Sequence, residues 1–166
     1  MEITRRLAIN WFSSEMLVAY QFCKVGYTLC VPLTPRPYDL LVDTGRQIVR
    51  VQVKRARFEG QRKRPQGLGD RDHWAVELDG RKTNGRSPKL HVAKDLDAYD
   101  YLAAVCLEDL IYVIPVSRLK SAEPGKMLRL IQIKPPVGTD GRDDSKMAGL
   151  RWEPFKNKFT LEESSE

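Results

Sequence analysis

The segment Pro37–Lys54, PYDLLVDTGRQIVRVQVK, decides the fold of this chain because it predicts two antiparallel strands joined by a tight turn. The first strand is expected over Tyr38–Asp43 and the second over Gln47–Arg57, since both are rich in Val, Ile and Leu. Between them, Thr44-Gly45 is a two-residue turn signal. The chain is therefore expected to contain a sheet built on this hairpin.

Alternation of side chains along the hairpin places its polar groups on one face. Arg50, Gln52 and Lys54 share a face of the second strand, whereas the valines between them face the core. With a two-residue loop, Asp39 pairs with Arg50 and lies diagonal to Gln52, within about 7–8 Å. A three-residue loop would put Asp39 on the opposite face.

These polar groups predict a metal site. One divalent ion can bridge an Asp39 oxygen, the Gln52 side-chain oxygen and the Val53 backbone carbonyl, with Lys54 beside the same point. Hard oxygen ligands suit Mg²⁺, and a cation beside a phosphate suits phosphodiester cleavage. Gln52 is the unusual member, because a second carboxylate is the usual ligand at such a site.

A helix is predicted before the hairpin, with Ser13 as its N-cap and Gly26 as its stop. Its apolar face is expected to contain Phe12, Met16, Ala19, Tyr20 and Cys23. Glu15 would lie in the first turn, where the helix dipole favours a carboxylate. That position alone gives Glu15 a purely structural interpretation beside a functional one.

Further strands are predicted on both sides of the hairpin. A strand is expected over Tyr27–Leu33, a second ribbon over Trp74–Leu78 and Lys89–Ala93, and two core strands over Tyr99–Leu107 and Leu110–Val116. From residue 117 onward, prolines predict short helices and loops.

The charge and cysteine content narrow the class of protein. The net charge is +6, and between Arg46 and Arg64 eight Lys or Arg accompany a single acid, Glu59, which favours a polyanionic partner. The three cysteines lie in apolar runs and are expected to be reduced core thiols. With no signal peptide and no apolar run of membrane-spanning length, a cytoplasmic protein is expected.

The order of Glu15 in a first helix, Pro37-x-Asp39 and Gln52-x-Lys54 resembles the PD-(D/E)XK nuclease superfamily. More narrowly, it is similar to the branch of small single-domain enzymes that includes a group I intron homing endonuclease with Gln-x-Lys. The resemblance covers about Phe12–Val116. It implies an α/β fold with a restriction-endonuclease-like core, in which a mixed β-sheet (helix, three-strand meander, helix, strand) is flanked by helices and carries an added β-ribbon. Residues 1–166 would form a single domain, with its core at about 12–116 and a C-terminal extension at 117–166.

The resemblance implies a metal-dependent endonuclease that hydrolyses phosphodiester bonds in duplex DNA, at specific sites of a homing or restriction-like kind. Mg²⁺, for which Mn²⁺ can substitute, would be held by Asp39, Gln52, Val53 and Glu15. Lys54 would act in catalysis with Asp39, Gln52 and Glu15. Two alternatives stay open: a Holliday-junction or other structure-specific resolvase, and an inactive DNA-binding module in which Gln52 marks lost catalysis.

Double-stranded DNA is the expected partner, without a membrane. The expected DNA contacts are Arg50, Arg55, Arg57, Arg62, Lys63 and Arg64 beside the site, and Arg81, Lys82, Asn84, Arg86 and Lys89 on the polar ribbon tip. A surface loop without a binding role is the alternative for that tip. Cutting both strands takes two sites, so a homodimer or homotetramer is expected.

Overall fold

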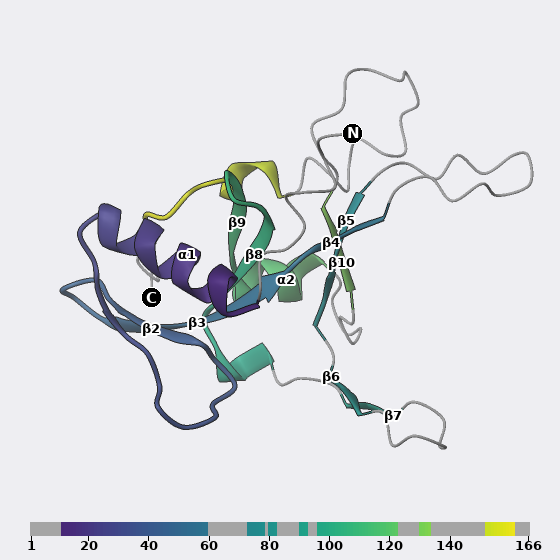
Figure 1. The fold of residues 1–166 in the computed structure, drawn as a ribbon, viewed down its shortest axis with the longest axis horizontal. Coiled ribbons are helices and arrows are strands. Elements are labelled where there is room, and N and C mark those ends of the chain that lie inside the picture. Colours follow the sequence, from purple (N-terminus) through teal and green to yellow (C-terminus); the bar gives the residue numbers. More distant parts are fainter. Residues whose placement is uncertain are drawn as a thin grey trace, which may run out of the picture.

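The structure, a computed structural model, describes residues 11–59, 73–78, 80–82, 90–92, 96–122, 130–133 and 152–161. Its centre is a five-stranded sheet in the order β1-β2-β3-β8-β9 (Figure 1). The strands are β1 (Thr28–Cys30), β2 (Leu40–Asp43), β3 (Ile48–Arg55), β8 (Tyr101–Leu107) and β9 (Leu110–Pro115). All neighbours are antiparallel except β3 and β8, which are parallel. The sheet is therefore mixed, as predicted.

A second sheet and a separate ribbon follow β3 along the chain. The second sheet has the order β10-β5-β4, formed by β10 (Leu130–Ile133), β5 (His73–Glu77) and β4 (Arg57–Glu59). The ribbon pairs β6 (Gly80–Lys82) with β7 (Leu90–Val92) and stands away from both sheets (Figure 1).

Helices and two apolar clusters complete the described core. Helix α1 (Trp11–Lys24) packs Val18 and Phe22 on one face of the central sheet, against the valines of β2 and β3. The other face packs against the second sheet and α2 (Val116–Ala122). The short helix η2 (Leu96–Ala98) precedes β8, and the short helix η4 (Glu153–Phe155) follows β10 along the chain. No helix in the described ranges has the length and apolar character to span a membrane.

The end of α1 confirms Gly26 as its stop. The Gly26 N–H donates to the Cys23 carbonyl at 3.0 Å, and the Tyr27 N–H donates to the Phe22 carbonyl at 3.2 Å. This is the Schellman pattern, in which the residue after the helix adopts a left-handed conformation. Gly26 has φ +93° and no Cβ to oppose it. Phe22 and Tyr27 add the accompanying apolar contact, with ring centroids 6.3 Å apart.

The predicted apolar face of α1 is wrong. Met16, Tyr20 and Cys23 are exposed, and the buried stripe contains Val18 and Phe22, with Ala19 as the one shared member whose burial is described. α1 also includes Trp11–Ser13, so Ser13 is not its N-cap and Glu15 lies beyond the first turn. Apolar residues occur all around this helix, and its periodicity therefore favours no single face.

The hairpin register differs from the predicted one by two residues. Asp43 pairs with Ile48, so four residues form the loop. Asp43 Oδ1 accepts the Gly45 N–H at 2.8 Å, and the Thr44 N–H donates to the Gln47 carbonyl at 3.0 Å. This side-chain turn accommodates two more residues than a two-residue loop. Because the change is even, the side chains keep their predicted faces.

The remaining strand predictions had mixed outcomes. The two core strands are confirmed as β8 and β9. The predicted pairing of Trp74–Leu78 with Lys89–Ala93 is wrong, because β5 pairs with β4 and β10 whereas β7 pairs with β6. Strand β10 was not predicted, although three of its four residues are apolar. In the described ranges between β3 and β8 the only helical segment is η2, and α2 follows β9. The prediction that the cysteines are core thiols is confirmed for Cys106, which is buried, and is wrong for Cys23 and Cys30, which are exposed.

Replacing Gly26 with Ala should lower the free energy of unfolding by about 1 kcal/mol, because an L-residue pays a steric cost at positive φ. The space around a Cβ at this position is open, so the effect isolates the backbone term. The loss would appear as a lower urea midpoint at an unchanged m-value. Gly26→Asn, which tolerates the left-handed region better, should lose less; equal stability of the Ala variant would contradict this account.

Candidate active site

The candidate site lies at the first residue of β2, Leu40, where the antiparallel strand β3 extends beyond its partner. One residue before β2 begins, the Asp39 N–H still donates to the Val51 carbonyl of β3, at 2.9 Å. Val53 points to the same edge of β3 but lies beyond the end of β2. Its N–H donates to Asp39 Oδ2 at 2.7 Å, and its carbonyl accepts Gln52 Nε2 at 3.2 Å. Side chains therefore replace the missing strand at Val53.

The Gln52 amide joins the two sides of this position. Gln52 is 4% exposed, and a buried amide must find hydrogen-bond partners. Its Nε2 donates both to Asp39 Oδ2 and to the Val53 carbonyl. Asp39 lies one residue before β2, whose first pair is Leu40 with Val51, and its carboxylate contacts Gln52 directly. The structure thus brings Asp39, Gln52 and Val53 into direct contact.

The oxygen atoms of this cluster fit a divalent cation. Gln52 Nε2 carries partial positive charge and lies within bonding reach of two oxygens, one from Asp39 and one from Val53. A cation at this point would find the same two oxygens, and Gln52 would add a third by presenting Oε1 in place of Nε2. Within the described ranges, no group of three or more His, Cys, Asp or Glu could hold a metal. The fit therefore depends on an amide and a backbone carbonyl.

Glu15 reaches the same site from α1. Its pKa lies above the ordinary value, first because burial disfavours the carboxylate and second because the negative charge of Asp39 acts on it. The positive charge of Lys54 acts in the opposite direction. Three groups far apart in sequence therefore sense one another electrostatically. Glu15 lies in the second turn of α1, so the helix dipole does not explain its position.

Lys54 directly follows Val53 on β3 and is half-buried. Its partner on β8 is Ala104, whose small side chain is fully buried. The positive charge of Lys54 acts on Glu15 and lowers its pKa. The site thus combines carboxylate, amide and carbonyl oxygens with one nearby cation, the set of groups predicted from the sequence.

The expected DNA contacts are only partly described. Arg55 is exposed at the end of β3, and Arg57 pairs with Glu77 at 3.7 Å. Arg50 forms an ion pair with Asp100. Arg62, Lys63, Arg64, Asn84, Arg86 and Lys89 lie outside the described residues, and for Arg81 and Lys82 only the backbone of β6 is described.

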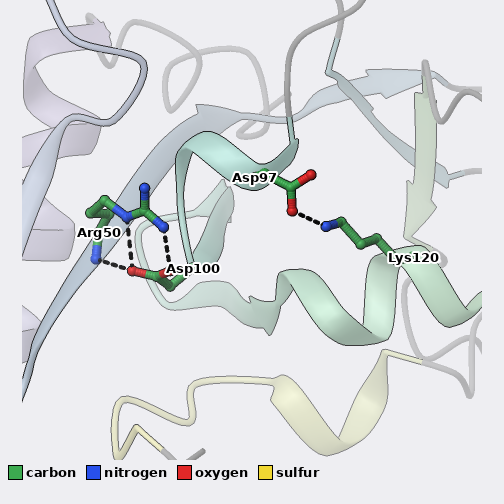
Figure 2. A network of polar contacts seen from close by, with 4 residues as sticks. All are labelled: Arg50, Asp97, Asp100 and Lys120. Atoms are coloured by element: carbon green, nitrogen blue, oxygen red, sulfur yellow. Dashed lines mark hydrogen bonds and ion pairs between the residues drawn. The ribbon is translucent and has the colours of Figure 1, made fainter.

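Asp100 is the residue of this region that sequence reasoning did not explain. It lies just before β8, and its carboxylate accepts hydrogen bonds from the Arg50 backbone N–H and from the Arg50 guanidinium, as Figure 2 shows. In the sequence, Asp100 stands out only as an acid immediately before a strongly apolar strand. That pattern is too common to identify Arg50, 50 residues away, as its partner.

Comparison with known proteins gives one family and a similar solved structure. The sequence profile described as PD-(D/E)XK endonuclease matches residues 13–134. The structure of a bacterial homing endonuclease, I-Ssp6803I, superposes with a TM-score of 0.64 at 19% sequence identity, over 94% of this chain and 89% of that chain. No curated protein matches the chain. These matches confirm the predicted restriction-endonuclease-like α/β fold.

The charges of the site predict opposite effects on the pKa of Glu15. Lys54→Met should raise it further, because a positive charge that lowers the pKa is removed. Asp39→Asn should lower it, because a negative charge that raises the pKa is removed. A ¹³C NMR titration of the metal-free protein, with Glu15→Gln for assignment, measures both.

Lys24→Met is the matched control, since it removes the same charge about 14 Å along α1 from Glu15. It should leave the Glu15 pKa unchanged. Shifts of the same sign in the Lys54 and Asp39 variants would show that the three groups do not share one site.

Proposed function

The chain belongs to the PD-(D/E)XK endonuclease family, and on that premise we propose that it is a Mg²⁺-dependent enzyme that cuts duplex DNA at specific sites. The observation that carries this proposal is the contact of Asp39 with Gln52 and with the Val53 backbone. The charges of Glu15 and Lys54 act at the same place.

Asp39, Gln52 and the Val53 carbonyl would hold the ion, with Glu15 as a further ligand. A bound divalent ion polarises the scissile phosphate and lowers the pKa of the attacking water. Lys54 would orient that water and stabilise the negative charge that develops on the phosphate oxygens. The pKa of Glu15 is raised first by burial and second by the negative charge of Asp39, and a bound cation would offset that second effect.

The DNA would lie across the basic end of β3 and beside the β6–β7 ribbon. Arg55 is exposed where β3 leaves the site, and phosphate contacts by such residues position a duplex. The ribbon stands away from the sheets (Figure 1), and a two-stranded ribbon fits the major groove. Two copies of the site are needed for a double-strand cut, so we expect a homodimer or homotetramer in solution.

Incubation with Mg²⁺ or Mn²⁺ on plasmid, linear duplex and four-way junction DNA tests the proposal. We expect cleavage of duplex DNA at few sites. Cleavage of four-way junctions whatever their sequence would instead indicate a resolvase, and DNA binding without cleavage would indicate an inactive module. Asp39→Ala and Lys54→Ala should each lower the cleavage rate by about 10²- to 10³-fold.

Both variants should bind duplex DNA in Ca²⁺ with an affinity within about twofold of the unmodified protein, because phosphate contacts dominate binding. Arg118→Ala is the matched control, since it removes one exposed positive charge from α2 and should cut normally. Unimpaired cleavage by Asp39→Ala would exclude the proposed metal site.

Gln52→Glu should bind Mg²⁺ more tightly, on the order of tenfold, because it adds a charged ligand. The metal-free variant should be less stable, since Glu cannot donate the hydrogen bonds that Gln52 makes to Asp39 and Val53. Isothermal titration calorimetry gives the affinity, and thermal melting with EDTA or Mg²⁺ gives the stabilities. An unchanged affinity would show that residue 52 is not a ligand.

A further inference from the structure

Asp100 and Arg50 are joined by both their backbones and their side chains. The Asp100 carboxylate accepts the Arg50 backbone N–H at 2.7 Å, Arg50 Nε at 3.1 Å and Arg50 Nη2 at 2.7 Å (Figure 2). In the other direction, the Asp100 N–H donates to the Arg50 carbonyl at 2.8 Å. One carboxylate thus holds both the main chain and the guanidinium of a single residue of β3.

These bonds lie at the start of the parallel pairing of β3 with β8. The first pair of that ladder is Val51 with Tyr101, one residue beyond Arg50 and Asp100. Asp100 is itself held at α2, because its carbonyl accepts the Val116 N–H at 2.9 Å. Burial alone would raise the pKa of Asp100, but the hydrogen bonds and charge of Arg50 outweigh burial and hold it below its usual value. The carboxylate is therefore ionised and bonded at neutral pH.

The proposed nuclease site begins two residues further along β3. Arg50 and Gln52 are about 7 Å apart along the strand. Gln52 pairs with Leu102, two residues after Asp100, so the two strands advance in step from the ion pair to the site. At its far end the same segment is held by Asp39, which accepts the Val53 N–H. Two aspartates on opposite edges of β3 thus bracket Gln52.

We propose that Asp100 is a positioning residue of the nuclease site, which acts through Arg50 to set where Gln52 and Lys54 stand relative to Asp39. The inference rests on the proposed function. It assigns Arg50 a role in the geometry of β3, where the sequence alone suggested a phosphate contact. Arg50 and Asp100 are 39% and 36% exposed, and a phosphate would meet a pair whose charges already compensate each other.

The two possible roles of Arg50 predict different kinetics for Asp100→Ala: a lower kcat if Arg50 positions the site, and a normal kcat if it contacts a phosphate. If Arg50 positions the site, removal of either partner lowers kcat by about tenfold to a hundredfold and leaves KM nearly unchanged, because misplaced groups lose transition-state stabilisation. The double variant, Arg50→Ala with Asp100→Ala, should be no slower than the slower single variant. Asp100→Asn, which keeps an acceptor for the Arg50 N–H, should fall between.

The neighbouring ion pair of Asp97 with Lys120 provides matched controls. It joins η2, which lies just before Asp100, to α2, as Figure 2 shows, and this ion pair does not include a residue of β3. Asp97→Ala and Lys120→Ala each remove one charge from a neighbouring ion pair, just as the test variants remove one charge from theirs. Their kcat should equal that of the unmodified protein, and a comparable loss in either would overturn the positioning role.

The salt dependence of DNA binding separates geometry from affinity. With the positioning role, Arg50→Ala leaves the slope of log affinity against log salt unchanged. A slope reduced by about one, together with tighter DNA binding and normal kcat for Asp100→Ala, would overturn the proposal in favour of a phosphate contact. If Asp100→Ala does not fold, Asp100→Asn and Arg50→Lys provide the same comparison.

A readout without DNA keeps this inference apart from the proposed function. Mg²⁺ should raise the melting temperature of the unmodified protein, and the rise should be smaller in Asp100→Asn but not in Asp97→Ala. If the unmodified protein cleaves DNA, and Asp100→Asn has the same kcat and the same Mg²⁺-induced rise in melting temperature, then only the positioning role is overturned. Absence of cleavage overturns the nuclease proposal, while the difference in Mg²⁺ stabilisation still decides the role of Asp100.

Discussion

The backbone of Val53 imposes the constraint on which the candidate site depends. This residue is buried in β3, yet β2 ends before it can supply a partner for its N–H and carbonyl. Buried peptide groups without hydrogen bonds are costly, so the two positions must be filled by side chains. Asp39 fills one and Gln52 fills the other. The gathering of oxygen atoms at this point therefore follows from the end of a strand, and a metal site can arise there without any further change in the fold.

Much of this arrangement could be predicted from the sequence, because the side-chain period of a strand is two. The loop of the hairpin is two residues longer than expected, but an even change preserves the faces, so Asp39 and Gln52 still meet. Contacts that depend on distant partners could not be predicted in this way. The buried face of α1 is set by Phe159 and the sheet, and the partners of β5 come from β4 and β10. The local sequence pattern carries no information about the buried face of α1 or about the partners of β5.

Gln52 has two consequences that a carboxylate would not have. As a donor it bonds the Asp39 carboxylate and the Val53 carbonyl without a cation. As a ligand in the proposed metal site it would contribute a neutral oxygen, which binds a divalent ion less strongly than a charged one. In that role Gln52 would favour a stable metal-free fold at the expense of affinity for the ion. An acid at the same position would reverse this balance.

The packing of Phe159 and Leu161 against α1 has a consequence for the order of folding. Phe22 and Phe159 meet edge to face with ring centroids 5.4 Å apart, and the Leu161 N–H donates to the Tyr27 hydroxyl across 134 residues. Contacts so distant in sequence form late, because a long loop must close first. During synthesis, α1 therefore reaches its final packing only after residues 159–161 have left the ribosome. Glu15 is carried by that helix, so it takes its final place in the candidate site only after residues 159–161 have been synthesised.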